Sequence, residues 1–285
     1  TLDTNRFIVN DMCAWVSNNT DKRKIALAIG NKNYKQSPLD NSGNDANDLS
    51  EALQSIGFVV ITKTNLNHED MGREIDQFIQ SIRPNDLVVF FFSGHGVQHE
   101  DINYLIPCDN DRIVSMSDFQ YRATNVKRMM DVMSDKKPFV IIYLLDCCRT
   151  YSSPHMSRSK GTGSAAAGLA CMAPNAGMLI AFACAPGTVA TDEAPNGKNG
   201  MFTYHLLKHL IRPGEDIMIS LRHVATGVCN DTRQRQIPHM TCALTWPHVC
   251  LASSQKGAAL TVKSIPNNSS STVISRQQGL FFLVF

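Results

Sequence analysis

The sequence has 285 residues, of which 43% are hydrophobic and 18% are charged, the composition of an ordinary soluble globular protein. A net charge of +2, with lysine and arginine scattered along the chain, gives no reason to expect nucleic acid or an anionic membrane as a partner. No apolar run reaches the roughly 20 residues that a membrane-spanning helix needs.

Cysteine usage points to a reducing compartment. The nine cysteines form no CxxC pair and no His/Cys zinc spacing, and their odd number does not suggest a disulfide framework. We expect most of them to be small buried side chains, and we therefore expect a cytoplasmic protein.

Apolar strands and amphipathic helices alternate along the sequence. The stretch "RKIALAIGNKNY", residues 23–34, predicts a buried strand, and residues 41–58 predict a loop followed by a helix with Leu49, Leu53 and Ile56 at helical spacing. The further predicted elements, in chain order, are a strand at 59–66, a helix at 68–82, strands at 86–96 and 103–109, a helix around 125–133, strands at 139–146 and 177–185, and helices at 201–211 and 217–231. Strands that are apolar on both faces predict an α/β fold, with a mostly parallel central sheet flanked by helices on both faces.

Residues 151–177 interrupt this alternation. They are rich in Ser, Gly, Ala and Pro, which predicts a flexible surface loop. The loop divides one domain into a larger part, 22–150, and a smaller part, 178–252, and we expect 1–21 and 253–285 to be flanks.

Two predicted strands end in reactive side chains. "VVFFFSGHG" ends at His95, and "VIIYLLDCC" ends at Cys147 and Cys148. The carboxyl ends of parallel strands form one edge of the sheet, where ligands bind. A histidine beside a cysteine is the minimum for nucleophilic acyl transfer, since the imidazole takes the thiol proton and the thiolate attacks a carbonyl.

The glycines around the histidine favour the same chemistry, because they let a substrate approach the backbone, and the amides of Gly96 and of the cysteine are candidates for an oxyanion site. Taken singly, such a histidine is more often a turn residue and such a cysteine more often a packing residue. The pair favours catalysis.

The motifs "FFFSGHG" and "LLDCCR" resemble the caspase-like cysteine peptidases, the clan of caspases, metacaspases and paracaspases. "IALAIGNKNY", "GNDANDLSEALQSIGF", "NYLIPCD" and "FACAPGTVATDEAPNGKNGMFTYHLLKHL" are also similar to that family, in matching order over roughly residues 23–250. The Asp-x-Cys-Arg arrangement looks closest to paracaspases and their bacterial relatives, and it departs from the caspase QACRG pattern at Asp146. The resemblance implies a caspase-like three-layer sandwich and a cysteine endopeptidase that needs no cofactor.

The resemblance assigns the nucleophile to Cys148 and the base to His95. Strand alternation agrees, because it places Asp146 and Cys148 on one face and turns Cys147 to the other face as a packing residue. If the strand curls into its loop by residue 147, the two cysteines exchange roles, and this alternative stays open.

Three carboxylates are expected to select a basic side chain before the scissile bond. Asp146 shares a face with the nucleophile, and the resemblance to metacaspases and paracaspases, whose acidic pocket accepts Arg or Lys, adds Asp45 and Asp192. Glu193 is an alternative to Asp192, which is otherwise a solvated loop residue, and the alternative for Asp45 is an acid at a helix N-terminus. A mismatched like charge in such a pocket is strongly rejected.

Metal ligation is not predicted. His95, His99 and Glu100 form a cluster in the sequence, but we expect a loop around the glycines, and the two histidines would share a face only on a helix. Calcium dependence, known for many metacaspases, has candidate ligands in Asp109 and Asp111, for which a solvated turn is an equal explanation.

The expected partners are protein or peptide substrates with Arg or Lys before the cleaved bond. Arg158 and Lys160 lie in the flexible loop, where such an enzyme would cut itself. Aspartate specificity, as in true caspases, and a scaffold domain with little activity are the alternatives. Dimerisation through the last strand, around "HMTCALTW", is left open by the sequence.

Overall fold

The computed structural model describes residues 22–100, 102–148, 172–185 and 190–253. Their helices and strands, in chain order, are β1 (Lys24–Gly30), α2 (Ser42–Ser55), β2 (Val59–Thr64), α3 (His68–Ser81), β3 (Leu87–His99), β4 (Ile102–Leu105), the 3-10 turns η1 (Asn110–Arg112) and η2 (Met116–Asp118), α4 (Phe119–Arg122), β5 (Thr124–Asn125), α5 (Val126–Asp135), β6 (Val140–Cys148), β7 (Met178–Phe182), α6 (Met201–His209), α7 (Ile217–Asp231) and β8 (His239–Cys242).

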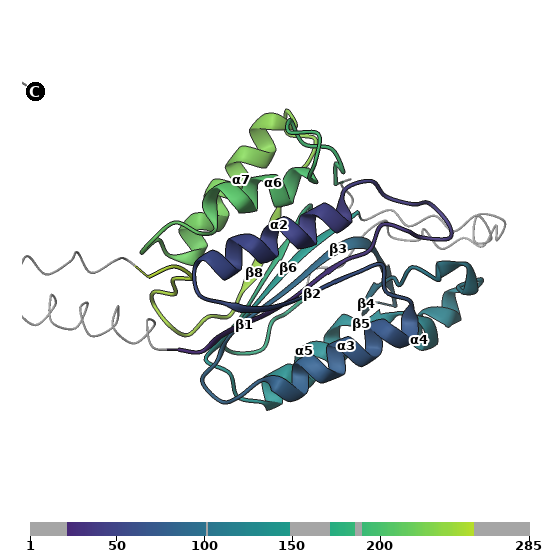
Figure 1. The fold of residues 1–285 in the computed structure, drawn as a ribbon, viewed down its shortest axis with the longest axis horizontal. Helices are drawn as coiled ribbons and strands as arrows, with labels where there is room; N and C mark the ends of the chain where they lie inside the picture. Colours follow the sequence, from purple (N-terminus) through teal and green to yellow (C-terminus); the bar gives the residue numbers. More distant parts are fainter. Residues whose placement is uncertain (1–21, 101, 149–171, 186–189, 254–285) are drawn as a thin grey trace, which may run out of the picture. The chain divides into compact units, whose positions relative to one another are not determined.

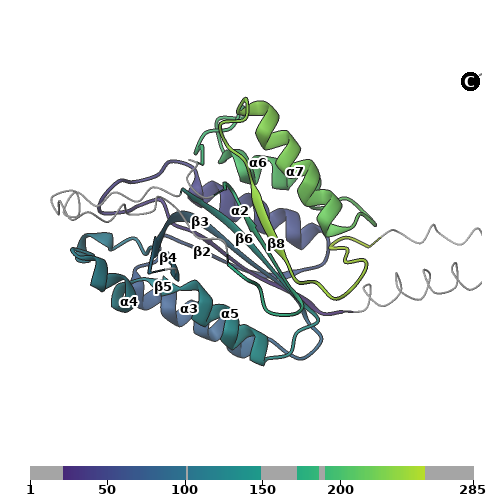
Figure 2. The same cartoon turned by 180° about the vertical axis from the view of Figure 1, so that it is seen from behind.

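The strands form one sheet with helices on both faces. Its main path is ordered β2-β1-β3-β6-β7-β8, with parallel pairing from β2 to β7 and an antiparallel β8 at the edge. Helices α2, α6 and α7 cover one face, and α3, α4 and α5 lie against the other (Figure 1; Figure 2 from behind). This arrangement confirms the predicted α/β sandwich.

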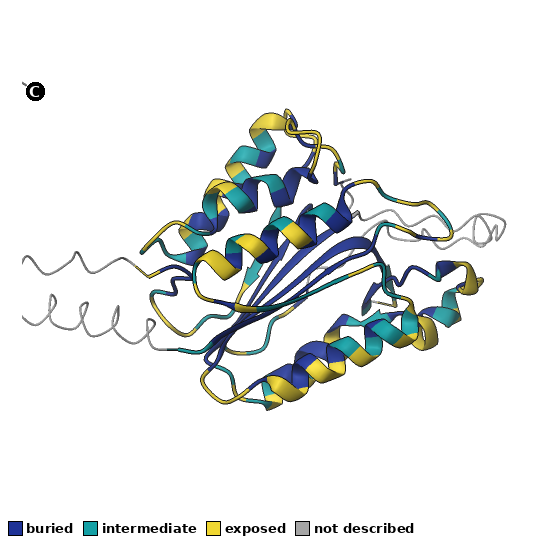
Figure 3. Ribbon diagram, in the orientation of Figure 1, coloured by how far each residue is buried: buried dark blue, intermediate teal, exposed yellow. Residues whose placement is uncertain are grey.

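Alternation along the strands divides the core into two apolar clusters. In β6, Ile142 and Leu144 pack toward α2, α6 and α7, whereas Ile141, Tyr143 and Leu145 pack toward α3 and α5. The central strands are buried along their length, while each helix is buried only along one stripe (Figure 3). Burial on both faces explains why these strands read as continuous apolar runs.

Local signals define the helix ends. The side chain of Asn67 accepts a hydrogen bond from the amide of Asp70 at the start of α3, and Asn125 does the same for Arg128 at the start of α5. Gly57 follows α2 with a φ of 90°, a left-handed conformation that favours glycine.

Strand β3 continues past the predicted loop. Residues 96–99 remain extended and pair with β4 in an antiparallel hairpin, with Gly96 opposite Leu105 and His99 opposite Ile102. The prediction of a loop around the glycines was wrong, because the hairpin partner supplies the hydrogen bonds that a lone apolar run does not reveal.

Candidate active site

The two predicted reactive strands lie side by side. β3 and β6 pair in parallel, and their register places His95 directly opposite Cys148. Neighbouring strands are about 4.8 Å apart, so the backbones of these two residues are in contact distance at the carboxyl edge of the sheet. The side chain of Cys148 lies outside the described part of the structure.

Cys147 follows the alternation. It is 2% exposed and belongs to the cluster that packs toward α3 and α5, together with Tyr143 and Leu145. Its neighbour Asp146 points to the opposite face, where its carboxylate meets Thr203 of α6. The strand has therefore not curled before residue 147, as the sequence argument requires.

His95 is buried and oriented by a backbone carbonyl. Its side-chain Nε2 lies 2.6 Å from the carbonyl oxygen of Ser37, in the segment between β1 and α2. Because a carbonyl only accepts, Nε2 carries the hydrogen, and the neutral ring has its basic lone pair on Nδ1. Burial lowers the pKa of His95, although the bond to Ser37 acts in the opposite direction. The ring is thus a neutral base at physiological pH.

Tyr34 holds the backbone of the histidine. Its hydroxyl accepts from the amide of His95 at 2.8 Å and donates to the carbonyl of Ile106 at 3.1 Å, and the two rings lie 4.3 Å apart. A Cβ atom on Gly94 would lie 2.4 Å from this hydroxyl. The expectation that Gly94 leaves room for substrate was wrong, because Tyr34 fills that space.

Two of the three predicted pocket acids meet at the N-terminus of α6. Asp45, 1% exposed, accepts from the amide of Gly200 at 3.0 Å, and Asp146, 8% exposed, accepts from the hydroxyl of Thr203 at 2.7 Å and from its amide at 3.2 Å. Gly200 has no side chain to cap the helix, so Asp45 of α2 and Asp146 of β6 accept from the amides of Gly200 and Thr203 instead. Ser93 donates to Asp45 at 2.9 Å and completes the cluster.

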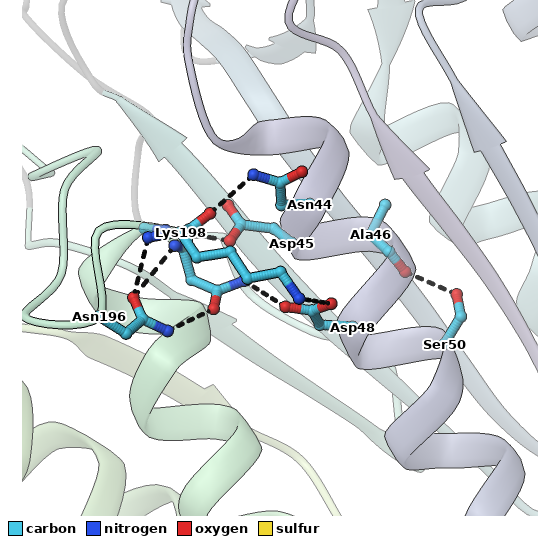
Figure 4. A network of polar contacts seen from close by, with 9 residues as sticks. Asn44, Asp45, Ala46, Asp48, Ser50, Asn196 and Lys198 are labelled. Atoms are coloured by element: carbon cyan, nitrogen blue, oxygen red, sulfur yellow. Dashed lines mark hydrogen bonds and ion pairs between the residues drawn. The ribbon is translucent and has the colours of Figure 1, made fainter.

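Residues of α2 also form hydrogen bonds and an ion pair with the segment before α6 (Figure 4). Asn44 donates to the carbonyl of Lys198 at 2.9 Å, and Asp48 binds Nζ of Lys198 at 2.6 Å and the side chain of Asn199 at 2.9 Å. These contacts join the larger and smaller predicted parts of the chain and fix the position of Asp45 beside Gly200.

Asp192 lies next to this pair. It accepts from the amide of Asp40 at 3.0 Å and lines an open surface pocket together with Asp40, Asn41 and Glu193. Asp192 is half-buried and its charge acts on Asp146, whereas Glu193 is exposed. Of the two candidates, Asp192 is therefore the one that faces the buried acids.

Burial dominates the electrostatics of the cluster. Burial and then the charge of Asp146 raise the pKa of Asp45 to about 8. Burial and then the charge of Asp192 raise the pKa of Asp146 to about 6, against the hydrogen bonds of Thr203. Burial also raises the pKa of Asp192. The three carboxyl groups therefore share a desolvated, acidic environment that disfavours ionisation of all three at once.

Several partners in the site were missed by the sequence reading. These partners come from three separate segments and were assigned no role from the sequence: Tyr34 and Ser37 before α2, Ser93 on β3, and Gly200 and Thr203 at the start of α6. Only Gly200, as a glycine directly before a helical pattern, carried a local signal.

The described residues contain no group of three or more His, Cys, Asp or Glu side chains placed to hold a metal ion. His99 lies 3.7 Å from Glu100, and Asp109 contacts Arg112 and the amide of His68. Arg158 and Lys160 lie outside the described residues. Nor does this part of the chain include a helix long and apolar enough to cross a membrane.

A family model for the caspase domain matches residues 23–248. The chain belongs to the caspase domain family. It is 24% identical over 259 residues to human mucosa-associated lymphoid tissue lymphoma translocation protein 1, covering 87% of this chain and 29% of that protein, and equally identical to its mouse homolog. The chain thus spans less than a third of these curated relatives.

Solved caspase structures have the same fold. Caspase-1 from Spodoptera frugiperda matches with a TM-score of 0.59 and 18% identity, over 84% of this chain and 94% of that one. Caspase-family membership indicates a peptidase of the cysteine kind, and it agrees with the resemblance drawn from the motifs.

Proposed function

We propose that this chain is a cysteine endopeptidase that cleaves peptide bonds after Arg or Lys. The observation that carries the proposal is the position of three acids, Asp45, Asp146 and Asp192, beside the paired strand ends of His95 and Cys148. A buried acidic recess next to a nucleophile selects a cationic side chain and rejects an anionic one.

Each residue has a defined role in the proposed reaction. His95 takes the thiol proton of Cys148 on Nδ1, and the thiolate attacks the carbonyl carbon of the substrate. The amides of Gly96 and Cys148 stabilise the oxyanion. His95 then protonates the leaving amine, and water hydrolyses the acyl-enzyme. The mechanism requires no cofactor.

Cleavage of matched fluorogenic peptides tests this function. The peptides differ only in the residue before the scissile bond, which is Arg, Lys, citrulline or Asp. We expect strong preference for Arg and Lys, and loss of activity in Cys148→Ala and His95→Ala. Cys147→Ala is the matched control, since it removes the neighbouring thiol from the opposite face of the sheet and should retain activity.

The alternatives give different results. Preference for Asp would overturn the roles of the three acids and favour a caspase-type specificity. If the folded chain cleaves none of the four peptides, the result would favour a scaffold domain that acts through protein contacts.

We further propose that the chain forms a homodimer through β8. This strand lies at the edge of the sheet and pairs only with β7 among the described elements, and Ile237 just before it is 42% exposed. An edge strand with open backbone groups is a template for a second strand. Light scattering should give twice the mass of the chain, and a single-chain mass would contradict the dimer.

A further inference from the structure

The Asp45–Asp146 pair has no cationic partner within the described residues. Its hydrogen-bond donors in the described structure are neutral: the hydroxyls of Ser93 and Thr203, the amides of Gly200 and Thr203, and the side chain of Asn199. The nearby Lys198 is bound to Asp48 instead, about one turn further along α2 than Asp45. Two buried carboxylates therefore share a site that supplies dipoles but no full positive charge.

The geometry brings the two carboxylates close together. A Cβ atom on Gly200 would lie 3.1 Å from Oδ2 of Asp146 and 3.2 Å from Oδ2 of Asp45, so both oxygens face the same glycine. The N-terminus of α6 points at them, and a helix N-terminus carries only about half a positive charge. This field supports one negative charge, and a second one nearby is disfavoured by repulsion and desolvation.

The other ionisable groups around the pair are mostly acidic. Asp192 lies beside Asp146 on the segment before α6, Asp40 and Glu193 line the adjoining surface pocket, and Asp48 lies one turn along α2. Two basic groups lie nearby, but neither offsets this negative charge. Lys198 is paired with Asp48, and burial keeps His95 on β3 neutral. The surroundings therefore add to the repulsion.

We infer that, in the absence of substrate, the Asp45–Asp146 pair holds one proton, and that binding of a guanidinium or ammonium side chain beside the pair releases this proton to solvent. The inference rests on the proposed function and adds to it a regulation of the same site. The incoming cation makes double ionisation favourable, because each carboxylate then faces an opposite charge. Acidification therefore weakens the binding of basic substrates at the pocket itself, separately from the catalytic pair.

Linkage gives the size of the effect. If binding releases one proton, the dissociation constant of a cationic ligand falls about tenfold for each unit by which the pH is raised, as long as the pH is below the pKa of the pair. Above that pKa the dissociation constant no longer changes with pH. A ligand with citrulline, the uncharged isostere of arginine, leaves the proton in place, and its affinity is expected to change little over the same range.

Calorimetry on the full-length Cys148→Ala chain tests the inference. A substrate peptide with Arg before the scissile bond is titrated near neutral pH in phosphate and in imidazole, which differ in ionisation enthalpy. The difference in observed binding enthalpy gives the number of protons released. We expect about one near neutral pH for the Arg peptide, close to none near pH 9, and close to none for the citrulline peptide.

Two further variants identify the source of the proton. Asp45→Asn in the Cys148→Ala background should still bind the Arg peptide, more weakly, but with proton release reduced several-fold. His95→Gln in the same background should keep the release. The opposite pattern, with release lost in His95→Gln and kept in Asp45→Asn, would assign the proton to the imidazole and overturn the inference.

The outcomes separate this inference from the proposed function. If the Arg peptide binds without proton release in the parent chain, the shared proton is disproved while the basic specificity stands. If the Arg peptide does not bind at all, while the citrulline or Asp peptide does, the proposed specificity fails first. Proton release by the parent chain, compared near neutral pH and near pH 9, tests the inference even if a variant fails to fold.

Discussion

Tyr34 connects His95, the proposed base, to the segment after β4. Its hydroxyl is shared between the amide of His95 and the carbonyl of Ile106, and its ring packs at a tilt against the imidazole. All these groups are buried, so each bond replaces one that water would otherwise make. At the residue scale, the orientation of the base depends on a side chain that takes no part in the reaction.

We predict that Tyr34→Phe lowers kcat about tenfold with little change in KM. It should also lower the free energy of unfolding by about 1–3 kcal/mol, because the buried amide of His95 loses the Tyr34 hydroxyl and the carbonyl of Ile106 is left with the longer bond from Asn31. The measurements are steady-state kinetics with an Arg peptide and urea unfolding. Tyr143→Phe is the matched control, since its hydroxyl contacts Met133 on the other face of the sheet. An equal loss of kcat in both variants would contradict the positioning role.

The raised pKa of Asp45 has a consequence for stability. The folded chain binds more protons than the unfolded chain between the ordinary carboxyl pKa near 4 and about 8, so ionisation of Asp45 destabilises the fold as pH rises across this window. This sign is opposite to that of a carboxylate in an ion pair, whose ionisation stabilises the fold.

We therefore predict that Asp45→Asn gains stability relative to the parent chain as pH rises from about 5 to about 9, by roughly 1–3 kcal/mol. Urea unfolding at several pH values measures the difference. Asp76→Asn, an exposed position on α3, controls for the loss of a surface charge. A difference that is constant with pH would show that Asp45 ionises in the folded state as it does in the unfolded one.

At the scale of elements, α6 carries the acid-binding N-terminus and α7 fixes its C-terminal half. Gly227 of α7 lies against the ring of His205 on α6, where a Cβ atom would come within 2.2 Å of Nδ1. On the same ring, Nε2 lies 2.9 Å from the carboxylate of Asp231. The close approach of the two helices depends on the missing side chain, which explains a glycine inside a helix.

We predict that Gly227→Ala destabilises the chain by about 1–3 kcal/mol through overpacking. Gly72→Ala is the matched control, because Gly72 lies in the middle of α3 with open space at its Cβ position, and it should gain up to about 1 kcal/mol of helix propensity. Thermal unfolding of both variants measures the two effects. Stabilisation by both would mean that α7 shifts freely on α6.

At the scale of the whole molecule, one sheet joins the two predicted parts of the chain. β6 of the larger part pairs with β7 of the smaller part from Ile141 opposite Met178 to Leu145 opposite Phe182. The contacts of Asn44 and Asp48 with the segment before α6 add a second link. A break in the connecting segment would leave both links in place.

We predict that the active chain cuts itself at Arg158 or Lys160 and that the two fragments stay together. Denaturing electrophoresis should separate them, while gel filtration should give one peak. The Arg158→Ala/Lys160→Ala double variant and Cys148→Ala should remain whole. A single intact band after prolonged incubation of active chain would refute self-cleavage.

The sequence by itself determined the layers of this fold and placed the two reactive residues at one edge of its sheet; the register that sets them opposite each other comes from the structure. Apolar runs and helical periodicity report which faces are buried, and parallel strands that end in His95 and Cys148 must bring these ends to one edge. The segment that links His95 to His99 was expected to be a loop and is a strand, because a hairpin depends on its partner strand as much as on its own residues.

Only the tertiary structure decided what surrounds the reactive residues. Gly200 meets Asp45 across 155 positions of sequence, Thr203 meets Asp146 across 57, and Ser37 meets His95 across 58. A local pattern encodes the burial of a segment but not the identity of its distant neighbours. The shared electrostatics of the two acids, and the neutral state of the histidine, arise from those neighbours and from the exclusion of water by the closed sandwich.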